Sequence, residues 1–450
     1  MPQDIVREIF VYFETYRLDA NNPEDFPWYL GHICSQWRTT LLSIGLQKVC
    51  ISPWFDQSFL DKKYKQIMIV VAHFLELNRD RQFDFDLRYE CYHFRPYRLH
   101  KAHLFGLLAA ASARWRHVAL NICPSICGAA LYQLKDHLPS IQSVRLRRMS
   151  CNKNRCSDDE EPPKDIFTNT PSLTHVELSL STWDWEFVWS NLTYLKLSFE
   201  IFKYQKPLLL SLQQATNLNT LVTDSMTPFN ISERITLPRL ESWRVLDYRW
   251  LSYIKAPELQ NLCLHGSPAH WHVRAIDINV VVSFLRESGC KLTRLTLADG
   301  PSDTLKILQY IPGLIHLNLV VEYGNIADYI ESLCVPVGSE LPAPRLQSLQ
   351  FDTSYYNLLR GGIIDGLQKL LSLRNGQAAN NGGRVERLNS LIFRKDVIRI
   401  EERLRKLCET FCVELRSPED ALHVLTEHQR VVLRVSPEQG CLFMLGEEIS

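Results

Sequence analysis

The sequence predicts an α/β protein built as a solenoid of short repeated units, each with a strand, a turn and a helix. Apolar residues recur at the first, fourth and sixth places of short segments, and helix-like runs lie between those segments. The chain has 450 residues, which exceeds the size of most single compact domains and favours several domains or a repeat array. Stacked units of this kind would share one continuous core and one curved parallel sheet.

The apolar pattern appears ten times from Trp115 onward. Its fourth and sixth residues would share one face of a strand, because successive side chains of a strand point to opposite faces. An eleventh copy begins at Leu218 but has Thr223 in its sixth place. The ten copies begin at Trp115, Ile141, Leu173, Leu192, Leu240, Leu259, Leu292, Leu314, Leu346 and Leu388.

Proline stands two residues before the first apolar place in six of the ten copies. Proline ends a preceding helix and keeps the chain extended, so each unit is predicted to be a turn that leads into a short strand. The spacing of the copies is irregular and only partly meets the period of about 20 to 29 residues that is typical of leucine-rich repeats. The six prolines are Pro139, Pro171, Pro238, Pro257, Pro312 and Pro344.

Helix-like runs separate the predicted strands. Residues 81–87 alternate like a half-buried strand and, with a predicted helix over 62–78, would form an entry unit. The Gly- and Asn-rich residues 375–384 predict a loop. Further helices are predicted over residues 102–114, 126–137, 277–287 and 397–411.

The first fifty residues depart from this pattern and are predicted to form three short helices. Ile5 and Ile9 stand at helical spacing in the first helix. Pro27 opens a later helix, which carries Trp28 and Trp37.

This stretch resembles the F-box, in the form found at the N-termini of mushroom-type fungal proteins. Residues 1–10 (MPQDIVREIF) are similar to the opening of the family motif, and residues 28–38 (WYLGHICSQWR) are similar to its Val-Cys-x-x-Trp-Arg core. A leucine-rich-repeat solenoid behind the box also fits the family plan. We therefore predict an F-box-like helical domain over residues 1–50, an irregular leucine-rich-repeat solenoid over 51–415, and a C-terminal cap or tail over 416–450.

The resemblance implies a non-catalytic substrate-recognition adaptor of a Skp–cullin–F-box E3 ubiquitin ligase, in the ubiquitin-like conjugation pathway. In that family the helices bind the Skp adaptor, and through it a cullin, while the solenoid offers a surface to a client protein. The alternative is a leucine-rich-repeat interaction scaffold without a ligase, whose N-terminal helices only cap the solenoid. The Skp-facing residues implied by the resemblance are Pro2, Ile5, Ile9, Phe10, Leu30, Ile33, Cys34, Trp37 and Leu41.

Polar residues at the fifth and seventh places of the units would share the strand face that points away from the core. A sheet face of mixed polar groups suits the recognition of a protein or peptide. Simple solvation of these side chains is an equally good interpretation of any one of them. The candidate client-binding residues are Arg145, Arg147, Glu177, Lys196, His265, Asn318 and Gln350.

Composition argues against several other partners. Fifty Lys and Arg residues balance fifty Asp and Glu residues, so no attraction of the whole chain to nucleic acid or to an anionic membrane is expected. The longest strongly apolar stretch, residues 67–75, is well below the ~20 residues of a membrane-spanning helix. The thirteen scattered cysteines are typical of reduced thiols in an intracellular protein of the cytoplasm or nucleus.

The sequence carries none of the common enzyme signatures, so no catalytic residues are predicted and the chain is not expected to be an enzyme. Cys91 and His93, followed by His100 and His103, form the best candidate metal cluster. Their spacing is poor for zinc, so they are interpreted as unrelated residues. No metal or cofactor is expected.

Overall fold

The chain forms two compact units, Met1–Ser225 and Met226–Ser450, and each is described here by itself. The computed structural model describes residues 4–6, 8, 18–20, 33–44, 48–51, 60–88, 95–121, 130–147, 164–180, 185–199, 210–224, 234–264, 277–298, 301–321, 326–335, 341–353, 362–380, 385–394, 401–411 and 413–416.

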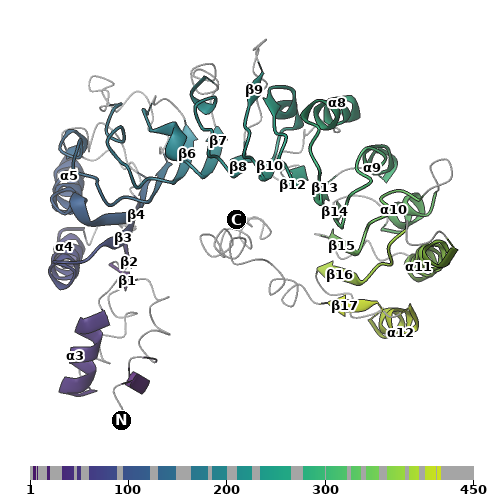
Figure 1. The fold of residues 1–450 in the computed structure, drawn as a ribbon. Coiled ribbons are helices and arrows are strands. Elements are labelled where there is room, and N and C mark those ends of the chain that lie inside the picture. The colour runs from purple at the N-terminus through teal and green to yellow at the C-terminus, as the bar shows by residue number, and fades with distance from the viewer. Residues whose placement is uncertain are drawn as a thin grey trace. The chain divides into compact units, whose positions relative to one another are not determined.

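The first unit is α/β, and its strands β1 to β8 pair in sequence order with every pair parallel (Figure 1). Such an arrangement follows when each repeat contributes one strand and the chain returns to the same edge of the sheet before the next strand begins. The strands are β1 (Leu18–Asp19), β2 (Lys48–Ile51), β3 (Phe83–Arg88), β4 (Trp115–Asn121), β5 (Ser143–Arg147), β6 (His175–Leu180), β7 (Tyr194–Phe199) and β8 (Thr220–Thr223).

Helices α4 and α5 lie on one side of the first strands of this unit (Figure 1). Trp115 is buried at the start of β4, and its indole Nε1 donates a hydrogen bond to the carbonyl of Leu108 in α5 at 3.1 Å. The Phe85 ring packs edge-on against Trp115 with centroids 4.8 Å apart. The described helices of this unit are α3 (Ser35–Ile44), α4 (Leu60–Leu77) and α5 (Arg95–Ala109), with 3-10 turns η2 (Ser112–Arg114) and η3 (Trp189–Asn191).

The second unit repeats this plan. Strands β10 and β12 to β17 pair parallel in sequence order, and β9 pairs with β11 in a separate two-stranded sheet. The strands are β9 (Ile235–Thr236), β10 (Ser242–Val245), β11 (Ile254–Lys255), β12 (Asn261–Leu264), β13 (Arg294–Leu297), β14 (His316–Val321), β15 (Ser348–Thr353), β16 (Ser390–Arg394) and β17 (Glu414–Arg416).

Helices of the second unit lie on one side of its strands (Figure 1). Helix α8 shows how the sequence sets their ends. The Asp277 side chain accepts a hydrogen bond from the Asn279 N–H at its start, and Gly289 ends it with φ 60° in the left-handed region. The described helices are α8 (Ile278–Ser288), α9 (Pro301–Leu308), α10 (Ile326–Leu333), α11 (Ile363–Asn380) and α12 (Glu401–Phe411), with a 3-10 turn η4 (Tyr248–Ser252).

The predicted apolar register is confirmed. Fourth-place residues pair with fourth-place residues along the sheet, as Leu262 with Leu295 and Leu295 with Leu317. Wherever their side chains are described, the fourth- and sixth-place residues of the ten copies are buried. The incomplete copy also forms a strand, β8, in which Thr223 is fully buried. The structure is therefore a solenoid-like α/β fold with a large parallel sheet.

Three predicted elements differ from the structure. Residues 18–19 and 48–51 form strands, although the first fifty residues were expected to be helical. Helix α11 continues to Asn380, so the loop predicted from residue 375 is wrong at its start. The helix predicted over 126–137 is helical only at 130–132 in its described part, and Asp136 has φ 63°, which a right-handed helix excludes.

Candidate functional site

The residues expected to face a Skp adaptor are only partly within the described chain. Ile5 is 49% exposed and Ile33 is 57% exposed, whereas Val6 beside Ile5 is fully buried. Cys34 is exposed and Trp37 is half-buried at the start of α3. Leu41 lies in α3, but its side chain is outside the described part, and Pro2, Ile9, Phe10 and Leu30 lie outside the described residues altogether.

Ile5 and Ile33 share one feature, an exposed aliphatic side chain. Burying an aliphatic side chain of this size stabilises a complex by about 1.5 to 3 kcal/mol relative to leaving it in water. Exposed aliphatic side chains and a half-buried tryptophan are residue types that interface anchors use. The geometry of the described residues is therefore compatible with a partner at this end of the chain.

The second candidate surface is the polar face of the strands in the first unit. On β5 the residues alternate, with Val144 and Leu146 buried and Arg145 and Arg147 half-buried on the opposite face. The register pairs Arg145 with Glu177 and Glu177 with Lys196. Three of the predicted client-binding residues are thus brought together in one row across β5, β6 and β7.

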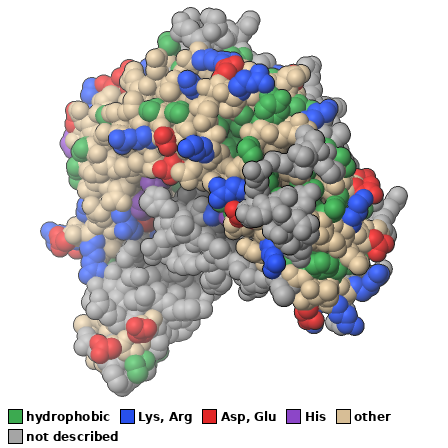
Figure 2. Space-filling model, turned by 45° about the vertical axis from the view of Figure 1, so that its right-hand side comes forward, with side chains coloured by type: hydrophobic (Ala, Val, Ile, Leu, Met, Phe, Trp, Pro, Cys, Tyr) green, Lys and Arg blue, Asp and Glu red, His purple; other side chains and the backbone are tan. Residues whose placement is uncertain are grey.

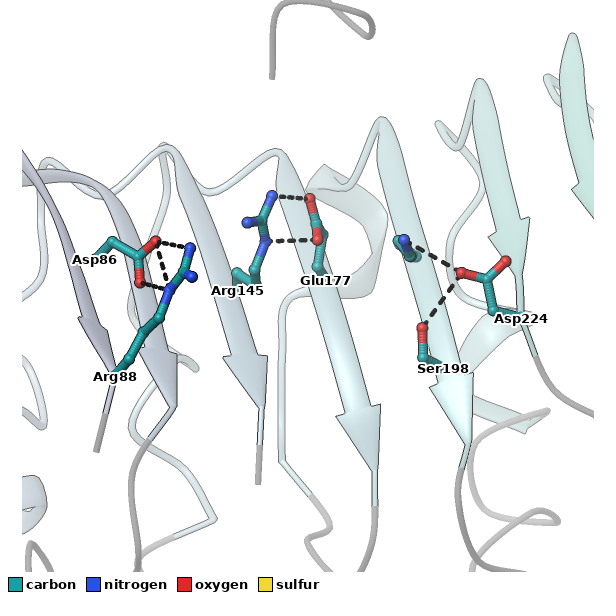
Figure 3. A network of polar contacts seen from close by, with 7 residues as sticks. Asp86, Arg88, Arg145, Glu177, Ser198 and Asp224 are labelled. Carbon is teal, nitrogen blue, oxygen red and sulfur yellow. Dashed lines mark hydrogen bonds and ion pairs between the residues drawn. The ribbon is translucent and has the colours of Figure 1, made fainter. Parts of the chain in front are cut away.

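Ion pairs cross this face from strand to strand (Figure 3). Arg145 donates from Nε to Oε2 of Glu177 at 2.6 Å and from Nη2 to Oε1 at 2.8 Å, so the guanidinium engages both carboxylate oxygens. Lys196 Nζ lies 3.2 Å from Oδ2 of Asp224. Ser198 Oγ donates to the same oxygen at 3.5 Å.

Burial and charge shift the two arginines of β5 in opposite directions. Burial lowers the pKa of Arg145, but the hydrogen bonds and the charge of Glu177 outweigh it, so the pKa of Arg145 is raised overall. Burial, followed by repulsion from Arg145, lowers the pKa of Arg147. The positive charge of Arg145 is therefore compensated by Glu177, whereas no described carboxylate forms an ion pair with Arg147.

The structure adds charged residues to this face that the sequence prediction did not include. Asp86 on β3 accepts from Arg88, with Nη2 to Oδ2 at 2.9 Å, and Asp224 directly follows β8. The sequence pattern already indicates the position of both carboxylates on this face. The alternation over residues 81–87 puts Asp86 on the polar face, and Asp224 holds the seventh place of the incomplete copy that begins at Leu218.

In the second unit, Asn318 on β14 and Gln350 on β15 are direct neighbours in the register. The Asn318 Oδ1 atom is buried and accepts no hydrogen bond from the part of the chain that the structure describes. His316 lies two residues before Asn318, and its pKa is lowered by burial and then by the charge of Arg294. His265 directly follows β12 and lies outside the described residues.

Charges of both signs are interspersed on the face shown in Figure 2, in keeping with the formal net charge of zero. Of the cations described above, Arg88, Arg145 and Lys196 each lie at ion-pair distance from a carboxylate. A surface of this kind presents few extended fields of one sign, which favours short-range recognition of a matched partner over steering of a polyanion.

Within the described ranges, no group of three His, Cys, Asp or Glu residues is placed to hold a metal ion. Cys91, His93 and the side chain of His100 lie outside them. Burial raises the pKa of Cys290 to about 11 and also raises the pKa of the Cys334 and Cys408 thiols. These three thiols are protonated at neutral pH and are poor nucleophiles. No helix in the described part of the chain has the length and apolar character to cross a membrane.

Comparison with known proteins adds no family to this description. No protein-family model matches the chain, and no curated protein matches it in sequence. The class that the described residues define is that of an α/β protein with parallel strand repeats.

Proposed function

We propose that this chain is a non-catalytic substrate adaptor of a Skp–cullin–F-box E3 ubiquitin ligase. Its first fifty residues bind a Skp adaptor and its strand faces bind a client protein. The strand repeats of both units are proposed to be irregular leucine-rich repeats, because their fourth- and sixth-place residues form the buried rows that define such units. The free thiols of the described chain support a place inside the cell.

The observation that carries the proposal is the exposure of Ile5 and Ile33, which lie within the two segments that resemble the F-box motif. Large aliphatic side chains that are 49% and 57% exposed contribute little to the core of their own unit. A second protein would remove them from water and recover the free energy of that burial.

Co-purification of the full-length protein with a recombinant Skp adaptor tests the proposal. The double variant Ile5→Asp/Ile33→Asp should weaken Skp binding by about tenfold or more, because both aliphatic anchors are lost. Trp37→Ala should cost about 2 kcal/mol or more of binding free energy if its side chain is an anchor as well. The matched control is Ile69→Asp, which alters an aliphatic side chain that is 68% exposed on α4.

Absence of Skp binding by the wild-type chain would refute the adaptor. Equal binding by the wild type and the double variant would show that these residues are not the contact. Unchanged thermal stability of the double variant is expected, since neither isoleucine is buried.

A second candidate function is an interaction scaffold whose N-terminal residues only cap the sheet. It is favoured by β1 and β2, because both strands pair parallel with the ladder that continues into β3. The Ala20 N–H also donates to the Cys50 carbonyl at 2.8 Å. Deleting residues 1–45 separates the candidates. A folded chain that has lost Skp binding supports the adaptor, and an aggregated chain that has lost no partner supports the cap.

A further inference from the structure

A row of polar residues crosses four neighbouring strands of the first unit, at the seventh place of the repeat. The register pairs Arg88 on β3 with Asn121 on β4, Asn121 with Arg147 on β5, and Arg147 with Ser179 on β6. Neighbouring strands lie about 4.8 Å apart, so the backbones of Arg88 and Arg147 are separated by about 10 Å. We call these four residues the Arg147 row.

Arg147 carries the charge that the adjacent groups leave uncompensated. Arg88 and Arg145 both have a carboxylate at ion-pair distance, Asp86 at 2.9 Å and Glu177 at 2.6 Å. Lys196 is likewise close to a carboxylate, Asp224. Within the described residues Arg147 forms no ion pair, and both oxygens of Glu177 already accept from Arg145.

Asn121 leaves a second group of the row unsatisfied. Its Oδ1 atom is buried, and no described residue donates a hydrogen bond to it. A buried acceptor without a donor costs about 1 to 3 kcal/mol. The row therefore presents, on the polar face of the sheet, a cation on β5 that has no ion-pair partner among the described residues, beside a polar residue on β4.

We propose that the Arg147 row binds an acidic side chain of a client peptide. The peptide carboxylate accepts hydrogen bonds from the Arg147 guanidinium, beside the neighbouring polar residues Asn121 and Ser179 of the same row. This inference deepens the proposed function, on which it rests for the existence of a client. A polyanion such as nucleic acid fits less well, because Asp86, Glu177 and Asp224 share the surface and would repel it.

A carboxylate also fits better than a phosphate group. The surplus on this face is a single positive charge, which one carboxylate neutralises. A phosphate group carries about −1.5 to −2 charges near pH 7. It would leave excess negative charge close to Glu177, which already neutralises Arg145.

The test selects random dodecapeptides displayed on phage against the immobilised full-length protein, with parallel selection against Arg147→Met. Selected peptides should carry Asp or Glu at one fixed position. Fluorescence anisotropy then measures each labelled peptide against its Gln and phosphoserine counterparts. Exchange of the acid for Gln should weaken binding to the wild type by about tenfold, and by less than about threefold in Arg147→Met.

The matched control is Arg403→Met, which removes the same charge from an exposed arginine of α12 and should leave peptide binding unchanged. Folding is checked by Tm. Arg147→Met should keep or raise the Tm, because a half-buried cation without a carboxylate is removed. Arg145→Met should lower it, because Glu177 then loses its partner.

Several results would overturn the inference. One is that no acidic peptide is selected. A second is that exchange of the acid for Gln weakens binding equally in the wild type and in Arg147→Met. A third is that the phosphoserine peptides bind more tightly than the carboxylate peptides. Residues 158–161 of the chain are themselves Asp-Asp-Glu-Glu. Binding of acidic peptides only after Asp158→Asn, Asp159→Asn, Glu160→Gln and Glu161→Gln would assign the row to the chain itself and refute a client.

The peptide assay contains no Skp adaptor, so its result is independent of the proposed ligase role. Arg147→Met should bind a Skp adaptor as the wild type does. A wild-type chain that binds a Skp adaptor but no acidic peptide refutes the inference alone, and a wild-type chain that binds acidic peptides but no Skp adaptor refutes the adaptor alone.

Discussion

Arg374 on α11 is a charged side chain that is almost completely buried, and it holds several carbonyl groups of the second unit. Its Nη2 donates to the carbonyls of Pro342 and Ala343 at 3.2 and 2.7 Å, and Nη1 donates to those of Leu346 and Glu386, both at 3.2 Å. Ala343 has φ 48°, in the left-handed region. Burial lowers the pKa of Arg374 to about 10, so it is still charged at neutral pH. The guanidinium thus stabilises a strained turn.

Arg374→Lys should destabilise the protein by about 3 kcal/mol, because an ammonium group cannot reach all these carbonyls and some are left buried without a donor. For a unit of this size the Tm should fall by roughly 6 to 12 °C in calorimetry. The control Arg387→Lys changes an exposed arginine of the same unit and should move the Tm by less than about 2 °C. Equal Tm values for the two variants would contradict the role of Arg374.

His316 makes the stability of the second unit dependent on pH. Its folded-state pKa is below the ordinary value of 6.5, because of burial and then Arg294. As the pH falls below about 6.5, the unfolded chain takes up a proton that the folded chain resists, so the free energy of unfolding decreases. Urea unfolding at pH 7.5 and 5.5 should show a smaller loss for His316→Gln than for the wild type. The exposed His103→Gln should behave as the wild type does.

At the scale of single elements, two glycines allow the effect of backbone conformation on stability to be distinguished from the effect of packing. A Cβ at Gly106 in α5 or at Gly289 after α8 would meet no atom within 4 Å. Gly289 has φ 60°, and its N–H donates to the Leu285 carbonyl, whereas Gly106 lies inside a helix.

Gly289→Ala should therefore cost about 1 to 2 kcal/mol, because a side chain disfavours the left-handed conformation. Gly106→Ala should stabilise by about 0.5 to 1 kcal/mol, since alanine loses less entropy in a helix. Chemical denaturation of both variants measures the difference. Changes of opposite sign in the free energy of unfolding support a backbone cause, and destabilisation by both variants would indicate packing instead.

Most strands could be predicted from the sequence because their apolar spacing is set by the buried row. Leu295 and Leu297, for example, stand where the pattern requires and are buried. The loop predicted from residue 375 is wrong at its start, because the weak helix propensity of Gly and Asn was given more weight than a helix already anchored by Leu370, Leu371 and Arg374. The strand β2 was not predicted because its four residues, KVCI, contain neither the proline nor the leucines of the repeat pattern.

The candidate site was predicted less completely than the fold. Alternation placed Arg145, Glu177 and Lys196 on one face, and the register bears this out. Which carboxylate each cation takes depends on pairing between strands far apart in sequence, as with Lys196 and Asp224. No local pattern contains that information, so Arg147 could not be recognised from the sequence as the unmatched cation.

At the scale of the whole molecule, the described strands pair one after another along each ladder, apart from β9 and β11, which form a separate pair. Stability in such arrays is close to a sum of terms between adjacent repeats, so damage should remain local. Trp115→Ala removes a buried ring that contacts Phe85 and Phe105. It should destabilise its own region by about 3 to 5 kcal/mol.

Hydrogen exchange read by mass spectrometry should show faster exchange in β3, β4 and α5 of Trp115→Ala, with β14 to β16 unchanged. Trp243→Ala, which alters a buried ring on β10, is the reciprocal control and should speed exchange around β10 and α8, since Trp243 packs against Phe284. Uniform acceleration over both units in either variant would rule out this local behaviour.

The brevity of the strands at the ends of the two ladders also limits self-association. Strand β1, which begins the first ladder, has two residues, and β17, which ends the second, has three, so each offers few backbone N–H and C=O groups to a foreign strand. Long, regular edges template edge-to-edge growth into aggregates, and short ones do not. A protein built from many parallel strands can in this way stay dispersed without closing its sheet into a barrel.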